Sequence, residues 1–233
     1  MSLNAAATTI NQKIDFKKLS QECLAALNNI QTLRATFTQQ THSQSGKKPA
    51  TPPKQRRAKT LADASNAEKP VVRPVTGTLF LKRPGKDDGI FGCMRLLYDQ
   101  KNMPDILSLG RTIYVMNKEG GTSQEFPLSN TPLALILRRK VSLGRFVVQK
   151  DLTVTQNRVF WTLAAGPGSQ TNNPALQTHA NDTGRLVLIF ARQPLRLIGW
   201  RIHDIYGGVT TIELNKTEIN RPLDPLIFKK STS

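Results

Sequence analysis

The sequence predicts a mainly β domain with two helices, whose strands follow one another as an antiparallel meander. Short segments that alternate apolar and polar residues recur between turn residues over most of the chain, as in antiparallel sheets and barrels. One N-terminal segment has helical spacing instead. One mid-chain segment carries the start signals of a helix. The elements are justified below in chain order.

The first helix is expected over residues 15–30. Its apolar residues recur at intervals of three and four and therefore share one helix face: Phe16, Leu19, Cys23, Leu27 and Ile30. Asp15 stands where an N-cap accepts backbone N–H groups. Residues 32–41 then alternate apolar and polar side chains, which indicates a strand with one solvent-exposed face.

Residues 42–74 have a different composition and are expected to be a disordered basic insertion. They hold eight Lys/Arg and two Asp/Glu, several prolines and no aromatic residue. Low hydrophobicity with high charge argues against a packed core. Because strands resume at once, the insertion interrupts a β-connection, and the prediction is one domain over residues 4–233.

Further strands are expected after the insertion, at residues 75–83, 93–99, 106–107, 112–117, 124–127, 146–155, 158–164, 185–191, 195–205 and 210–215. One helix interrupts them, in the stretch SNTPLALILRR. It offers Ser129, Asn130 or Thr131 as N-cap, Pro132 in the first turn, and arginines at its end. Residues 166–183 are expected to form a flexible loop.

Composition limits the function classes. The 233 residues carry a formal charge of +17, which attracts polyanions such as nucleic acid, an anionic membrane or an acidic partner. No phosphate-binding loop, nucleophile elbow or metalloprotease motif is present, and the three histidines are scattered. We therefore expect no catalytic residue, no metal, no cofactor and no enzyme. Cys23 and Cys93 belong to no Cys/His cluster, and whether they pair is left open.

No apolar run reaches the roughly 20 residues of a membrane-spanning helix. The first residues also lack the basic start and apolar core of a secretory signal. Two readings follow: a cytoplasmic chain, or one from which a signal has been removed.

Several segments, in order, resemble the LolA family of periplasmic outer-membrane lipoprotein carriers. They are LRATFTQ, GTLFLKRPG, MRLLYD, IYVMN, PLSNTPLALIL, GWRIHDIYGGVTTIEL and PLDPLIF. The resemblance implies an incomplete, curved antiparallel β-barrel covered by a helical lid. It also implies a periplasmic carrier, its signal peptide removed, that shelters lipoprotein acyl chains in an apolar cavity between the inner and outer membranes. Two insertions longer than the family's, and Leu109 in place of a usual aspartate, depart from the pattern.

Arg83 is the residue of most interest. By alternation it shares a strand face with Leu79 and Leu81. Read from the residues alone, it is a rim residue with its guanidinium in water. The resemblance implies a latch instead, in which Arg83 hydrogen-bonds the lid and holds the empty carrier closed.

The same reading places the other site residues. The lid is expected at Pro132, Leu133, Leu135 and Ile136. The acyl-chain cavity is expected to be lined by Phe37, Leu79, Leu81, Leu96, Tyr98, Ile113, Val115, Trp161 and Trp200. A filled core is the other reading of these residues, and the inward face of the last strands is left open.

The resemblance implies acylated lipoproteins as cargo, an inner-membrane lipoprotein-releasing ABC transporter as donor, and an outer-membrane receptor. The protein is expected to be a monomer that is attracted to anionic lipid surfaces. Two alternatives remain: a LolB-like outer-membrane receptor of the same fold, and a basic protein that binds nucleic acid or another anionic surface. Specific nucleic-acid binding is not expected, because the aromatic residues lie within apolar alternations.

Overall fold

A computed structural model describes residues 15–42, 73–117, 124–128, 131, 133–141, 147–155, 157–165, 185–203 and 208–230. Most of the predicted insertion, the loop at 166–183, and Ser129, Asn130 and Pro132 lie outside these residues.

The first helix, α1, spans Phe16–Asn28. Asp15 caps it as expected, because its carboxylate accepts the backbone N–H groups of Lys17 and Lys18. Cys23 and Leu27 lie on its buried face, and the helix packs against the strand β10.

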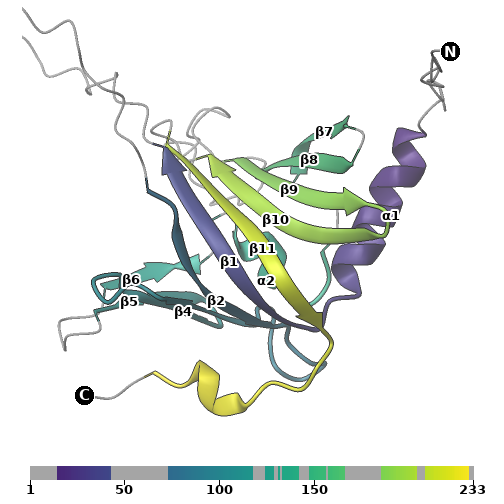
Figure 1. Cartoon of the computed structure of the whole chain (residues 1–233). Coiled ribbons are helices and arrows are strands. Elements are labelled where there is room, and N and C mark those ends of the chain that lie inside the picture. Colours follow the sequence, from purple (N-terminus) through teal and green to yellow (C-terminus); the bar gives the residue numbers. More distant parts are fainter. Residues whose placement is uncertain are drawn as a thin grey trace, which may run out of the picture.

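Eleven antiparallel strands form one sheet. They are β1 (Thr32–His42), β2 (Val75–Lys82), β3 (Cys93–Tyr98), β4 (Asp105–Leu109), β5 (Thr112–Met116), β6 (Gln124–Pro127), β7 (Val147–Val154), β8 (Arg158–Ala165), β9 (Arg185–Arg192), β10 (Leu195–His203) and β11 (Val209–Ile219). Their order is β6-β5-β4-β3-β2-β1-β11-β10-β9-β8-β7. The sheet is thus two meanders joined where β1 pairs with β11 (Figure 1).

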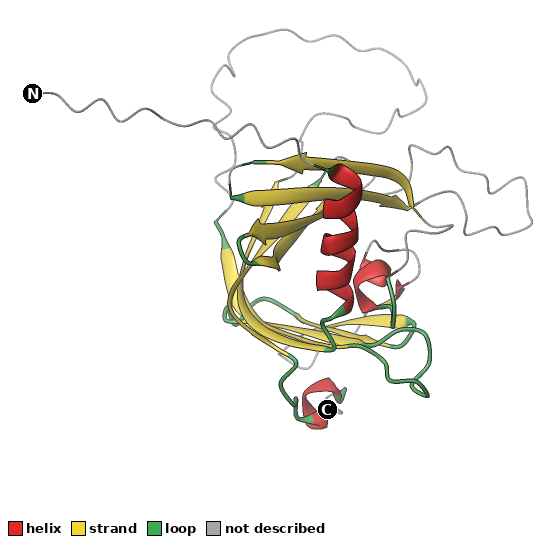
Figure 2. Ribbon diagram, turned by 90° about the vertical axis from the view of Figure 1, so that its right-hand side faces the viewer, coloured by secondary structure: helices red, strands yellow, loops and turns green. Residues whose placement is uncertain are grey.

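The sheet curves strongly but does not close, because β6 and β7 remain its two edges. A short helix, α2 (Leu133–Leu137), lies in the connection between these edges. Figure 2 shows both helices inside the curve of the sheet. The predicted fold class, an incomplete curved antiparallel barrel with helices covering its concave side, is confirmed.

Several element bounds differ from the sequence expectation, most clearly those of β11 and α2. The strand expected at 210–215 continues to Ile219. Lys216 adopts a positive φ of 45°, and the pairing with β1 shifts between Arg34 and Thr36. A β-bulge of this kind bends a strand without ending it. The second helix is shorter than expected, because Arg138 already forms a β-bridge with Phe91.

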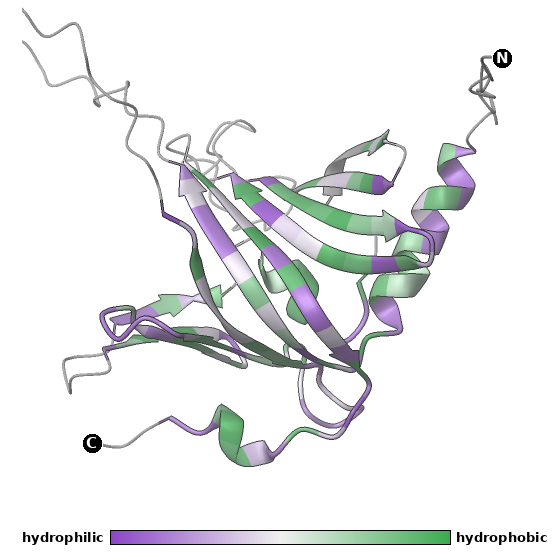
Figure 3. Ribbon diagram, viewed as in Figure 1, coloured by the Kyte–Doolittle hydropathy of each residue, from purple (hydrophilic) through white to green (hydrophobic). Residues whose placement is uncertain are grey.

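Alternation divides the side chains between the two faces, as the bands of hydropathy along the strands show (Figure 3). The larger apolar cluster fills the concave face together with α1 and α2. A smaller cluster on the convex face contains Phe80 and Leu107, and the C-terminal 3-10 helix η3 (Pro225–Phe228) covers it through Phe228.

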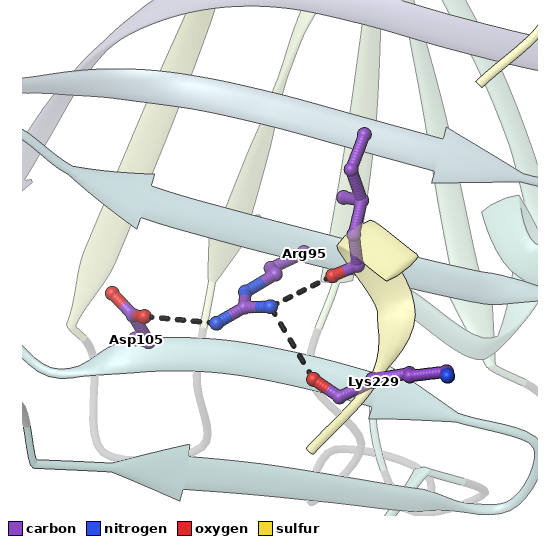
Figure 4. A network of polar contacts seen from close by, with 4 residues as sticks. Arg95, Asp105 and Lys229 are labelled. Atoms are coloured by element: carbon purple, nitrogen blue, oxygen red, sulfur yellow. Dashed lines mark hydrogen bonds and ion pairs between the residues drawn. The ribbon is translucent and has the colours of Figure 1, made fainter. Parts of the chain in front are cut away.

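A half-buried arginine holds η3 in place. Arg95 donates to the carbonyl oxygens of Ile227 at 2.8 Å and Lys229 at 3.4 Å. It also forms an ion pair with Asp105 at 3.2 Å. Figure 4 shows Arg95 between Asp105 and Lys229. The C-terminal segment, residues 225–230, is therefore held against the convex face and is called the strap below.

The cysteines belong to different clusters. Cys23 lies in the concave cluster, whereas Cys93 packs against the convex one, and both are free thiols. No helix among the described residues could span a membrane. In the same part of the chain, no group of His, Cys, Asp and Glu side chains is arranged to hold a metal ion.

Candidate functional site: the concave face and its lid

The concave face brings together nearly all of the predicted cavity residues. Those that join its apolar cluster, each at most 7% exposed, are Phe37, Leu79, Leu81, Leu96, Tyr98, Ile113, Trp161 and Trp200. Val115 is half-buried and does not join that cluster. The alternation of each strand fixes which side chains point inward, so residues far apart in sequence meet here.

Tyr98 supplies a polar group within this apolar surface. Its hydroxyl donates to Gln39 Oε1 at 2.7 Å, and its ring meets Phe37 edge-on with centroids 5.3 Å apart. Burial raises the pKa of Tyr98 to about 12, and the Gln39 hydrogen bond opposes that rise. Gly77 permits this packing, since a Cβ there would lie 2.8 Å from the Phe37 ring.

The helix α2 covers the cluster as a lid. Of the predicted lid residues, Leu135 and Ile136 are buried and Leu133 is half-buried against the concave cluster, whereas Pro132 lies outside the described residues. At its N-terminal end, Thr131 donates its hydroxyl hydrogen to the carbonyl of Leu128 at 2.9 Å. The preceding strand thus fixes the start of the lid.

The C-terminal end of the lid is attached to the loop between β2 and β3. The Gly92 N–H donates to the carbonyl of Leu137 at 2.8 Å. Arg139 donates to the carbonyls of Lys86 and Gly89. The guanidinium of Arg138 lies over the Phe91 ring, 5.4 Å from its centroid. These contacts attach the lid to the loop between β2 and β3, which begins with Arg83.

Arg83 is buried at 3% exposure. Its Nη1 donates to Asn28 Oδ1 at 3.3 Å. Its Nε and Nη2 are buried and have no hydrogen-bond partner among the described residues. Burial lowers the pKa of Arg83 to about 10. The reading of a rim residue with its guanidinium in water is therefore wrong.

Asn28 is the functional candidate that sequence reasoning missed. Besides Arg83, its side chain forms two hydrogen bonds with Val141, just beyond the lid: Oδ1 accepts from the backbone N–H at 2.8 Å, and Nδ2 donates to the carbonyl at 3.1 Å. Within the described residues, Arg83 thus reaches the lid segment through Asn28 rather than by a direct bond to α2. No local pattern marks Asn28, which ends the helix as one of two adjacent asparagines.

A hollow lies on the convex face. Its volume is about 400 Å³, and mostly polar side chains of β1, β10 and β11 line it, among them Arg201, His203 and Glu213. Its polarity makes it unsuited to hydrocarbon chains. The candidate site for an apolar ligand is therefore the concave face.

Residues 63–231 match the family model described as outer membrane lipoprotein carrier protein LolA. The chain belongs to the LolA family. The match includes the lid and every strand except β1, and it begins after α1, so Asn28 lies outside it. No curated protein matches the chain significantly.

Several solved structures are similar to this LolA-family chain at low identity. A DUF1329 family protein from Desulfovibrio piger is 10% identical with a TM-score of 0.49, over 92% of this chain and 95% of that one. A putative outer membrane lipoprotein-sorting protein domain from Vibrio parahaemolyticus is 10% identical with a TM-score of 0.47, over 91% and 94%. The lipoprotein LppX from Mycobacterium tuberculosis is 10% identical with a TM-score of 0.42, over 90% and 97%.

Proposed function

We propose that this LolA-family protein is a periplasmic carrier that shelters the acyl chains of lipoproteins during their passage from the inner to the outer membrane. The observation that carries the proposal is the concave face, a large apolar surface covered by one amphipathic helix and a five-residue lid. Each methylene kept from water contributes about 0.8 kcal/mol, so a lipid anchor needs such a surface to cross an aqueous space.

In this proposal the acyl chains displace α2 from the concave cluster and occupy its place. The competing contacts are those of the empty state: the lid against the apolar cluster, and the Arg83–Asn28–Val141 connection. Because these contacts oppose loading, the cargo is bound less tightly than the apolar area alone would give, and a receptor can accept it. The donor is an inner-membrane lipoprotein-releasing ABC transporter, and anionic lipid attracts the basic carrier to both membranes.

The test is transfer of a diacylated lipoprotein between two membranes. The wild-type protein should release the lipoprotein from proteoliposomes that contain the transporter, as a water-soluble one-to-one complex, and pass it to acceptor membranes. A wild-type protein that forms no soluble complex would refute the carrier role.

Arg83→Leu tests the latch. Leucine removes the buried guanidinium and its bond to Asn28, which favours the loaded state, so this variant should take up cargo but deliver it slowly. The exposed Arg34, which is paired with Glu218 on the convex face, provides the matched control Arg34→Leu. Delivery by Arg83→Leu at the wild-type rate would refute the latch and leave the carrier role standing.

A further inference from the structure

Two buried hydrogen-bond donors in the concave cluster lack acceptors. Trp161 and Trp200 are both fully buried. The Nε1 atom of each indole is buried and has no hydrogen-bond partner in the described part of the chain. Buried polar groups are nearly always hydrogen-bonded, and buried indole N–H groups usually find an acceptor. Two exceptions in one apolar cluster point to an acceptor that the described residues do not supply.

The two tryptophans lie in one row across the sheet. Leu188 of β9 pairs with Trp161 of β8 on one side and with Trp200 of β10 on the other. With strands spaced by about 4.8 Å, the two tryptophan Cα atoms are roughly 10 Å apart. Both tryptophans therefore lie in the same part of the concave face. Their strands belong to a different meander from β2, which Arg83 follows.

The chemistry of these donors selects a class of acceptor. An indole N–H donates one hydrogen bond and accepts none. The pairing partners in the same row are apolar: Leu152 and Leu188 for Trp161, and Leu188 and Ile212 for Trp200. A carboxylate placed there would be a buried charge without a counter-charge, which is costly. A neutral carbonyl oxygen can accept from an indole without that cost.

We propose that Trp161 and Trp200 form a carbonyl-reading subsite. Their indole N–H groups donate to the ester or amide carbonyl oxygens at the head of the ligand's acyl chains. The subsite makes the protein select acylated lipids over alkyl chains of equal length. This inference rests on the proposed function, since it requires the ligand to enter the concave cluster.

The experiment compares two lipopeptides that differ only in the carbonyl groups. Both carry a glyceryl-cysteine peptide. One has two hexadecanoyl esters and the other two hexadecyl ethers. The wild-type protein should bind the ester form more tightly. Trp161→Phe and Trp200→Phe remove the N–H but keep an aromatic ring, and each should lower the ester-to-ether affinity ratio about threefold to tenfold.

The ester-to-ether affinity ratio separates hydrogen bonding from packing, because a loss of side-chain volume weakens the binding of both lipopeptides alike. Leu188→Val, between the two tryptophans, is the matched control and should leave the ratio unchanged. If either phenylalanine variant does not fold, benzothienylalanine at the same position retains the bicyclic shape and replaces N–H by sulfur.

The outcomes distinguish the two proposals. If the wild type binds both lipopeptides but the tryptophan variants retain the wild-type ratio, the carbonyl-reading subsite is wrong and the carrier role stands. If the wild type binds neither lipopeptide, both proposals are overturned.

Discussion

At the scale of single residues, the Asn28 amide connects three segments of the chain. It ends α1, accepts a hydrogen bond from Arg83 after β2, and pairs with the backbone of Val141 beyond the lid. In the described part of the chain, Asn28 Oδ1 is the acceptor for both Arg83 Nη1 and the Val141 N–H. Among the side chains that fix the lid segment, Asn28 is therefore the one that also binds Arg83.

Asn28→Ala should lower the free energy of unfolding by about 2–4 kcal/mol, because it leaves buried donors and an acceptor unpaired. Chemical denaturation measures this. The neighbouring Asn29 is exposed and forms the control variant Asn29→Ala, which should change stability by less than about 0.5 kcal/mol. Equal effects of the two substitutions would show that the Asn28 connection is not a stabilising one.

The depressed pKa of Arg83 has a consequence at alkaline pH. Its folded pKa of about 10 lies below the ordinary value of 12.5, so the unfolded state binds the proton more tightly. Burial of the charge therefore destabilises the protein at neutral pH, and this cost is relieved as the pH rises through 10.

The Arg83 contribution is isolated by subtracting the free energy of unfolding of Arg83→Leu from that of the wild type. Tyr98, whose raised pKa has the opposite effect on stability, is present in both proteins and therefore cancels. The free energy of unfolding of the wild type should rise relative to that of the variant by about 1 kcal/mol between pH 9 and pH 11. Denaturant titrations at several pH values measure it. A constant difference over this range would mean that the Arg83 pKa is not depressed.

Sequence alternation predicted which side chains share the face of Arg83, because period-two geometry is local. It could not predict Asn28, whose partner Val141 lies 113 residues away. Such a contact depends on how the strands between them curve, and short-range patterns do not encode that.

At the scale of elements, the lid depends on the close approach of backbones near its C-terminal end. A Cβ on Gly92 would lie 2.0 Å from the Lys82 carbonyl oxygen and 2.8 Å from Arg83 Cα. Gly92 is also the donor to the last carbonyl of α2. A side chain at this position must therefore move β2, Arg83 or the lid.

Gly92→Ala should loosen the lid and expose the concave cluster more often. The readout is Cys23, which is fully buried and whose pKa burial raises to about 11, so that it is unreactive when the cluster is closed. In a Cys93→Ser background, alkylation of Cys23 should be several times faster in Gly92→Ala than in the parent. Gly85→Ala is the control, because the nearest atom to its Cβ belongs to the flexible Asp88 carboxylate, at 3.0 Å. Equal rates in both variants would contradict the role of Gly92.

The sequence predicted every described strand and both α-helices but not the 3-10 helix η3, and two of the misplaced ends are instructive. The NKTE stretch has the polar composition of a turn, but the bulge at Lys216 lets β11 continue along β1. The apolar run of the lid has helical signals throughout, but the β-bridge of Arg138 ends it early. In both cases pairing with a segment distant in sequence determined the end of the element.

At the scale of the whole molecule, the sheet has a separate cover on each face. The helices cover the concave face, and the strap covers Phe80 and Leu107 on the convex face. The strap is held by Arg95, by Lys230 paired with Glu125 at 3.3 Å, and by its apolar side chains. The contacts that hold the strap and those that hold the lid involve different residues, so each cover should be removable without the other.

Arg95→Leu should release the strap. Proteolysis after Lys229 or Lys230 should become faster, and an apolar dye should bind the uncovered convex patch, while lipopeptide affinity at the concave face stays within about twofold. Arg158→Leu, which removes a half-exposed ion pair with Glu213, provides the control. If lipopeptide affinity falls together with strap release, the two faces are not independent.

The apolar composition of residues 222–228 was evident from the sequence, but their position was not. They follow the last strand, and their composition alone does not determine which face they cover. Arg95 decides between the faces, because its guanidinium lies on the convex side and donates hydrogen bonds to the carbonyl oxygens of the strap.

The pairing of the first strand with the last has a further consequence for folding. Leu33 of β1 aligns with Ile219 of β11, so the two meanders unite only after nearly the whole chain is available. Contacts this distant in sequence slow the search for the native state. During that delay each half-sheet exposes the apolar face that is later buried in the concave cluster. The apolar surface on which the proposed carrier role rests should therefore also make the nascent chain dependent on holding factors that prevent aggregation.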